Sequence, residues 1–413
     1  MSALNVALLT IGGLVLLVGL FSSPIKRSLL SAPIVALLLG VLLGPAVFGM
    51  LDPAEWGSQE TILEQAARLT IAISLMGIAL RLPSGYPFSR WRPLAVMLGP
   101  VMVLMWLVSG MLVYLILGLP FWVAMLVGAV ITPTDPVISS TIVQGDMAED
   151  NLPGRVRHLL SGESGANDGL AYPLVFLSLL MIERPPADAL THWLTHVVLW
   201  EVGAAVALGA VMGYAAGCLL GRAEDKGNIE QPSYLAYTLA LSLAVLGGTK
   251  LLGTDGLLAV FAAGIALNVA VDTEDDTQEE RMQEAVNRFF VLPVFVLLGL
   301  ALPWQQWLEL GWAGLLLVAA VLLLRRLPAV LAVTPIVPQA RGLRDALFLG
   351  WFGPIGVAAL FYASLSLREI GAEEVWVVGS LAICASILVH GVSAAPLTRL
   401  YGRTAKDEGS EDE

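Results

Sequence analysis

Two short polar signatures interrupt segments of the chain that are otherwise apolar. The first is Thr132-Pro133-Thr134-Asp135-Pro136, and the second is Gly162-Glu163-Ser164-Gly165-Ala166-Asn167-Asp168. They place carboxylates inside stretches expected to cross a membrane, where charge is costly and is kept mainly for function. The prolines of the first signature also remove helical hydrogen bonds. Carboxylates beside a broken helix indicate an ion-binding site.

The spacing of the second signature sorts its polar residues on a helix. Glu163 and Asn167 are four residues apart and share one face, while Ser164 and Asp168 share the adjacent face. Ser164 and Asn167 could serve only as hydrogen-bonding contacts between helices. The two carboxylates are different, because an unpaired carboxylate in a low-dielectric interior is strongly disfavoured unless it is protonated, paired or bound to a cation.

A basic pair later in the chain offers Glu163 a partner. Arg325 and Arg326 lie in the apolar run 322–328. Arginine stays charged, so each must form an ion pair or extend to the membrane surface. We expect one of them to pair with Glu163 and the other to reach the cytoplasmic interface, and these residues alone do not say which does which. Asp168 then remains as the carboxylate that is free to titrate.

The composition indicates the elements that position these groups. Of the 413 residues, 57% are hydrophobic and 14% are charged, and the mean hydropathy is +0.79. These values are typical of an integral membrane protein. A helical crossing takes about 20 apolar residues, so we expect an all-α polytopic fold with about 13 transmembrane helices. The predicted spans lie near residues 5–21, 29–50, 62–80, 93–118, 121–143, 158–182, 195–219, 233–249, 254–271, 288–303, 309–332, 344–366 and 375–397. We expect residues 1–403 to form one membrane domain and residues 404–413 a short, disordered acidic tail.

The distribution of Lys and Arg predicts the orientation. Most of them fall at the end of an odd-numbered span or the start of the next, and the other side has little more than Arg184, Lys250 and Arg368. The positive-inside rule then puts the amino terminus outside and the carboxyl terminus in the cytoplasm. We expect the protein in a prokaryotic inner or plasma membrane. The acidic segment 272–280 is predicted to be solvated, and the net charge of −12 argues against a nucleic-acid partner.

A second helix break is predicted in the twelfth span, at Gly350-Trp351-Phe352-Gly353-Pro354-Ile355-Gly356. Gly and Pro at this density interrupt a helix. The fifth and twelfth spans are seven apart, and an odd offset means that they cross the membrane in opposite directions. Spans one to six and eight to thirteen therefore fit two inverted repeats, with the seventh span as the linker. Interrupted segments at corresponding positions of two halves indicate a transport site near the membrane centre.

As a set, these motifs resemble those of the monovalent cation/proton antiporters, especially the NhaP-like branch of sodium/proton exchangers. The resemblance rests on Thr134-Asp135-Pro136, on Gly162-Glu163-Ser164 with Asn167-Asp168, and on Arg326 followed by Leu-Pro-Ala-Val. A further match at residues 253–264 extends it over nearly the whole chain. It implies two inverted six-helix repeats, with the fifth and twelfth helices unwound and crossing, and a homodimer.

The resemblance also implies the ligands of a monovalent cation. Asp168 corresponds to the carboxylate that binds the cation and the proton in turn, Asn167 to the asparagine before it, and Ser164 to a hydroxyl ligand. Thr134 and Asp135 correspond to residues of the unwound helix that offer a backbone carbonyl and a carboxylate.

Glu163 and Arg326 correspond to a structural ion pair, with Arg325 as the alternative partner. The order Asn-Asp at residues 167–168 resembles electroneutral exchangers, whereas electrogenic relatives typically have Asp-Asp. Two departures leave the ligand number and the choice of ion open. The third span has Leu75-Met76-Gly77-Ile78 where some relatives carry a glutamate, and Pro354-Ile355 stands where many relatives have an arginine between glycines.

The predicted function is exchange of a monovalent cation for a proton, one for one. Burial favours a protonated Asp168 and a bound cation favours an ionised one, so the two compete for one carboxylate. Sodium is the expected cation, with lithium or potassium as alternatives. We expect no enzymatic activity and no cofactor. The expected partners are the two ions, membrane lipid and a second copy of the chain.

Two other classes of function fit parts of the sequence. A passive cation channel would use the same polar groups, but a pore loop or a repeated charged ring is not evident. Gly162-Glu163-Ser164-Gly165 also fits the motif of rhomboid-type intramembrane proteases, with His390 as a base. This alternative is weak, because a serine nucleophile gains nothing from the carboxylates of Glu163 and Asp168 beside it.

Overall fold

The computed structural model describes the chain in several stretches. They are residues 2–21, 31–135, 138, 145–226, 234–271, 277–337, 339–340 and 342–411. Every regular element in these stretches is a helix. The predicted all-α fold class is therefore confirmed. Pro136 of the first signature and residues 272–276 of the predicted acidic segment lie outside the described residues.

The described helices occur in the following order along the chain. Up to the site they are α1 (Ser2–Leu20), α3 (Ala32–Leu43), η1 (Pro53–Glu55), α4 (Gln59–Arg81), α5 (Tyr86–Ser89), α6 (Trp91–Val96), η2 (Met97–Val101), α7 (Met102–Leu117), α8 (Phe121–Val130), α10 (Asp146–Asn151), α11 (Gly154–Leu170) and α12 (Tyr172–Glu183). The remainder are α13 (Pro186–His192), η3 (Trp193–Ala204), α14 (Ala205–Asp225), α15 (Tyr234–Leu251), α16 (Gly256–Val271), α17 (Thr277–Leu300), α18 (Trp304–Leu324), α19 (Leu327–Val333), η4 (Thr334–Ile336), α20 (Leu343–Trp351), α21 (Val357–Ile370) and α22 (Glu373–Glu411).

Among the described residues, seven helical runs are long and apolar enough to cross a membrane. They are Gln59–Arg81, Trp91–Leu117, Gly154–Glu183, Pro186–Ala223, Tyr234–Leu251, Trp304–Ile336 and Glu373–Thr404. Shorter apolar helices accompany them, at Asn5–Leu20, Ala32–Leu43, Phe121–Val130, Gly256–Val271 and Phe289–Leu300. The protein is an integral membrane protein. The count of 13 helices and the inverted repeats stay predictions.

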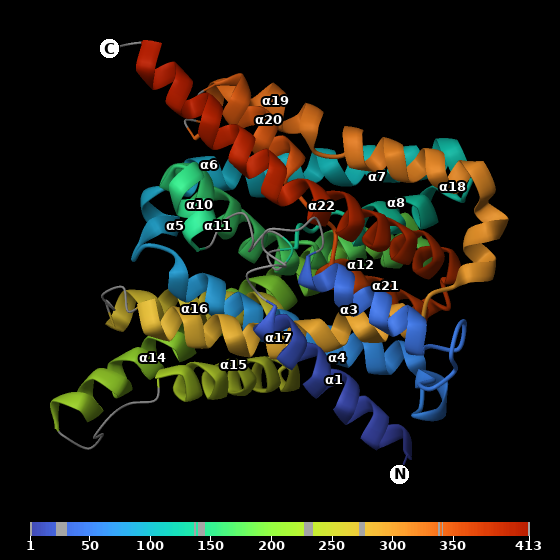
Figure 1. Cartoon of the computed structure of the whole chain (residues 1–413), viewed down its shortest axis with the longest axis horizontal. Coiled ribbons are helices and arrows are strands. Elements are labelled where there is room, and N and C mark those ends of the chain that lie inside the picture. The colour runs from blue at the N-terminus through green and yellow to red at the C-terminus, as the bar shows by residue number, and fades with distance from the viewer. Residues whose placement is uncertain are drawn as a thin grey trace.

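The helices form layers around a buried middle layer (Figure 1). On one side α4, α16 and α17 pack together, with α3 on α17 and with α14 and α15 against α16. On the other side lie α7, α18, α19, α20 and α22. Between these groups run α8, α11, α12 and α21, with α21 packed on α4 and α11 contacting both α4 and α16. The helices that carry the predicted site are thus enclosed by the rest of the protein.

Small residues allow the closest helix contact in this arrangement. Where α14 crosses α16, a side-chain carbon added to Gly209 would overlap the backbone of Ala259, and one added to Gly213 would overlap the backbone of Ala263. Only glycine permits this approach. Close packing by small residues is the usual way for helices to associate in lipid, where hydrophobic burial between helices provides little driving force.

Both predicted helix breaks occur where the sequence places them. The chain leaves α8 after Val130 and is non-helical from Thr132 to Asp135. It leaves α20 after Trp351 and re-enters a helix at Val357, the first residue of α21. Pro133 and Pro354 lie in these gaps and lack the backbone N–H that a continuous helix would need.

The carboxyl-terminal helix reaches beyond the predicted end of the membrane domain. α22 runs from Glu373 to Glu411 and therefore includes residues 404–411 of the predicted tail. The backbone there is helical, and the division of the chain at residues 403 and 404 stays a prediction.

Candidate ion-binding site at the crossing of two broken helices

The two unwound segments touch each other directly. The backbone N–H of Asp135 donates a hydrogen bond of 2.7 Å to the carbonyl of Pro354. The Asp135 carboxylate then accepts the N–H of Val357, at 2.6 Å, and that of Ile138, at 3.2 Å. A side-chain carbon at Gly356 would overlap this carboxylate, so glycine is required there. Asp135 therefore caps the amino-terminal end of α21, where the helix dipole favours negative charge.

Arg325 fills the opposite electrostatic role at the crossing. Its guanidinium donates to the carbonyls of Ile131 and Thr132, just after α8, and to the carbonyl of Gly353, just after α20. The side chain is only 3% exposed. The expectation that one arginine reaches the cytoplasmic interface is therefore wrong. The reason is that two helices end here with unpaired carbonyls, which attract and satisfy a cation more effectively than a long extension to water.

Arg326 is the partner of Glu163. Its two terminal nitrogens bind the two carboxylate oxygens at 2.6 and 2.8 Å, and its Nε donates to the Leu349 carbonyl at 2.9 Å. Both residues are 2% exposed. The chain bends between α18 and α19 at these arginines, just before Pro328. The bend lets consecutive arginines serve different partners, Arg326 on α11 and Arg325 at the crossing.

A hydrogen-bonded group of three residues ties the first unwound segment to α11. The Thr134 N–H donates to Asn167 Oδ1 at 3.1 Å, and Asn167 Nδ2 donates to Thr134 Oγ1 at 2.6 Å. Ser164 Oγ lies 3.1 Å from Thr134 Oγ1. Asn167 Nδ2 also donates to Glu163 at 3.0 Å. The structure thus brings together three of the residues that the sequence proposes as ligands, Thr134, Ser164 and Asn167, and the Asn167 amide adds a contact to Glu163.

The Asp168 carboxylate makes no hydrogen bond to this group of described residues. Its side chain is 1% exposed, and its buried Oδ1 accepts no hydrogen bond from any residue that the structure describes. Its backbone carbonyl accepts the hydroxyl of Tyr362 at 2.6 Å. Asp135 and Glu163, in contrast, are bound by backbone N–H groups and by an arginine. An oxygen without a donor, in an enclosed place, is suited to a proton or a cation.

Further supporting residues were missed by the sequence reasoning. Ser386 Oγ accepts the N–H of Ile355 at 2.7 Å, and His390 binds Ser386 Oγ at 3.0 Å and the Trp351 carbonyl at 3.1 Å. The four-residue spacing of Ser386 and His390, which puts both on one face of a helix, is the sequence feature that could have predicted their contact. His390 therefore binds groups beside the break in the twelfth span, whereas Ser164 contacts Thr134. Ser164 and His390 do not form the Ser-His dyad of a protease.

Comparison with known proteins decides the family. The sequence profile of the family described as sodium/hydrogen exchanger, transmembrane, matches residues 12–400. The chain belongs to the sodium/hydrogen exchanger family. Among solved structures, the exchanger fold agrees with that of the sodium proton antiporter MjNhaP1 from Methanocaldococcus jannaschii, with a TM-score of 0.68, 19% sequence identity, and coverage of 98% of this chain and 97% of that chain.

Curated members of the exchanger family are more similar in sequence. Na(+)/H(+) antiporter 2 of Zygosaccharomyces rouxii is 33% identical over 417 residues, covering 92% of this chain and 52% of the relative. The Na(+)/H(+) antiporter of Saccharomyces cerevisiae is 32% identical over 396 residues, covering 88% of this chain and 40% of the relative. This chain therefore spans about half the length of these two fungal exchangers.

Proposed function

We propose that this protein exchanges a monovalent cation for a proton, with Asp168 as the carboxylate that binds each in turn. One observation supports this most directly. Of the three carboxylates at the crossing, only Asp168 has a buried oxygen without a hydrogen-bond donor among the described residues. Family membership and the sodium/proton activity named for the fungal relatives agree with sodium as the cation.

The mechanism is competition at one group. An empty, ionised Asp168 is strongly disfavoured in a low-dielectric interior, so it is occupied by either a proton or a cation. Ser164 lies one helical turn before Asp168 on the same face of α11, and its hydroxyl contacts that of Thr134. These two hydroxyls are the neutral oxygen ligands that we propose for the cation. If only occupied forms cross between the two faces, each cation moved one way is matched by one proton moved the other way.

The remaining charges hold the site in shape without taking part in exchange. Asp135 and Arg325 neutralise the positive and negative ends of the broken helices. Glu163 is neutralised by Arg326. We therefore propose a stoichiometry of one cation to one proton, with no net charge moved and no cofactor.

Reconstitution into liposomes that contain a pH-sensitive dye tests this function. When the liposome interior is made acidic, external NaCl should dissipate the pH gradient, and LiCl and KCl added in turn give the ion preference. Choline chloride is the matched control and should have no effect. Cation flux that persists without any proton movement would contradict exchange and favour the passive channel.

The placement of the protein is also a proposal. We propose that the amino terminus lies outside and the carboxyl terminus in the cytoplasm, from the distribution of Lys and Arg. Labelling of single cysteines introduced near each end, with a reagent that does not cross membranes, tests it.

We also propose a homodimer, which is tested by the mass of the detergent-solubilised protein. The relatives named above are fungal and archaeal, and a prokaryotic host stays a prediction.

A further inference from the structure

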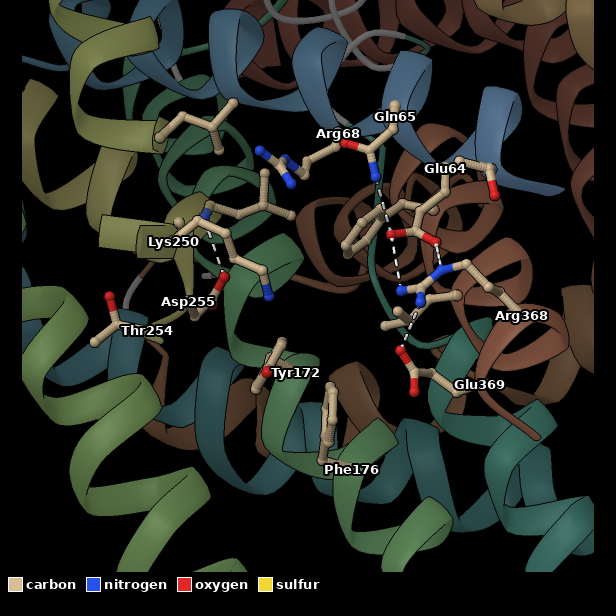
Figure 2. A pocket seen from close by; sticks show the side chains of 16 residues that line it. Glu64, Gln65, Arg68, Tyr172, Phe176, Lys250, Thr254, Asp255, Arg368 and Glu369 are labelled. Carbon is tan, nitrogen blue, oxygen red and sulfur yellow. Dashed lines mark hydrogen bonds and ion pairs between the residues drawn. The ribbon is translucent and has the colours of Figure 1, made fainter. Parts of the chain in front are cut away.

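A cavity separate from the crossing opens between α4, α12, α15, α16 and α21 (Figure 2). Its volume is about 370 Å³, enough for several water molecules. Asp168 is not among its lining residues. Its charged lining residues are Glu64, Arg68, Lys250, Asp255, Arg368 and Glu369. Tyr172 and Phe176 of α12 form part of its wall.

The charges on this wall differ in how they are partnered. Arg368 is paired with Glu64, at 2.6 Å, and with Glu369, at 2.9 Å. Asp255 is 4% exposed, and its Oδ1 accepts the N–H of Leu257 at 3.0 Å. Its other oxygen, Oδ2, is buried and accepts no hydrogen bond from the described part of the chain. Asp255 is therefore a lining residue of the cavity, and one of its carboxylate oxygens is buried without a donor among the described residues.

The cap of α16 explains only half of this side chain. Through Oδ1, Asp255 satisfies the first turn of α16, but Asn or Ser would do so equally well and without a charge. The negative charge also suits the amino-terminal end of α16, where the helix dipole is positive, but the second oxygen still has no donor among the described residues. Lys250 lies on the same wall, with its side chain directed into the cavity (Figure 2), and no ion pair within 4.0 Å joins it to Asp255 among the described residues. A partly hydrated monovalent cation fits both the chemistry and the space.

Packed side chains connect the surroundings of Asp255 with those of Asp168 at the crossing. Tyr172, on the cavity wall, follows Asp168 by four residues on one continuous helical run, which is about 6 Å along a helix axis. Leu258, three residues after Asp255, packs against the position of Gly169, next to Asp168. Tyr362 is fully buried and binds the Asp168 carbonyl. About one helical turn of packed side chains therefore separates the cavity from Asp168.

We propose that Asp255 is an entry site, at which the transported monovalent cation binds the carboxylate before it reaches Asp168. This inference rests on the proposed exchange function and adds a second carboxylate to its path. Because the cavity lies to one side of Asp168, the entry site acts on cations that arrive from one face of the membrane only. Lys250 opposes that attraction by its positive charge.

The test measures the KM for Na⁺ separately at each membrane face, in vesicles with the full chain in one orientation. Asp255→Asn keeps the cap and removes the charge. It should raise the KM about fivefold to tenfold at the face nearer the cavity. The KM at the other face and the maximal rate should stay within about twofold of the parent. Asp255→Ser, which also keeps the cap, should behave alike. Lys250→Gln, at an exposed residue, should lower the same KM.

Each result supports or overturns the entry site. An unchanged KM in Asp255→Asn, or a KM raised equally at both faces, would show that Asp255 only caps α16. A KM raised by Lys250→Gln would also overturn the proposal, and this variant gives an answer even if both Asp255 variants fold poorly. A parent chain that exchanges no cation would instead overturn the proposed function, so the two failures are distinguishable.

Discussion

At the scale of single residues, the carboxylates of the site differ in their partners more than in their burial. Asp135, Glu163 and Asp168 are all at most 2% exposed, but only Asp168 has an oxygen without a donor among the described residues. Asp168→Asn keeps the shape of the side chain and removes both the proton site and the negative charge. We expect exchange to be abolished in the dye assay, with the melting temperature close to that of the parent. Asp188→Asn, at an exposed carboxylate on α13, is the matched control. A rate like the parent's in Asp168→Asn would overturn the proposed function.

The ion pair of Glu163 and Arg326 makes a prediction about stability. Removing one partner of a buried pair leaves an uncompensated charge, at a cost of about 3–5 kcal/mol. Glu163→Gln and Arg326→Gln should each lower the melting temperature of the solubilised protein strongly, and the double variant should recover part of the loss. If the two single losses simply add in the double variant, the side chains are not coupled as a pair.

At the scale of elements, the crossing depends on backbone geometry as much as on charge. The helix α21 begins beside the carboxylate of Asp135, and Gly356 leaves the space for it. Gly356→Ala should displace Asp135 or the start of α21, and we expect at least a tenfold loss of exchange rate, equivalent to about 1.4 kcal/mol. Gly247→Ala in α15, where an added carbon meets nothing within 4 Å, is the control. Equal rates in the two variants would show that the close approach has no role in transport.

At the scale of the whole molecule, the charge balance of the crossing predicts electrical silence. Asp135 is held by the helix ends and Glu163 by Arg326, which leaves Asp168 as the one group that alternates between proton and cation. Exchange driven by a sodium gradient should then be independent of a membrane potential clamped with valinomycin. Each net charge moved across 100 mV is worth about 2.3 kcal/mol, so a rate that changes severalfold would reveal a second transported charge. Electroneutral exchange would be excluded, while cation/proton exchange would stand.

The sequence by itself determined the features that depend on local chemistry. Apolar content and the length of apolar runs predict a helical membrane protein, because a backbone in lipid must satisfy its own hydrogen bonds. Proline and glycine predict both helix breaks, since Pro lacks an N–H wherever it lies. The spacing of Glu163 and Asp168 on one helix likewise follows from helical geometry.

Only the tertiary structure decided which partner each charge takes. Asp135 caps α21 although Val357 is 222 residues away in the chain, and Arg325 binds the carbonyls of Ile131 and Gly353 from two different broken helices. No local pattern contains these contacts, because they exist only once the two unwound segments cross. The same is true of Asp255, which lines a cavity formed by five helices and has a buried oxygen without a donor among the described residues. In the sequence it is one residue of a family motif, and its free oxygen depends on how α15, α16 and α21 pack.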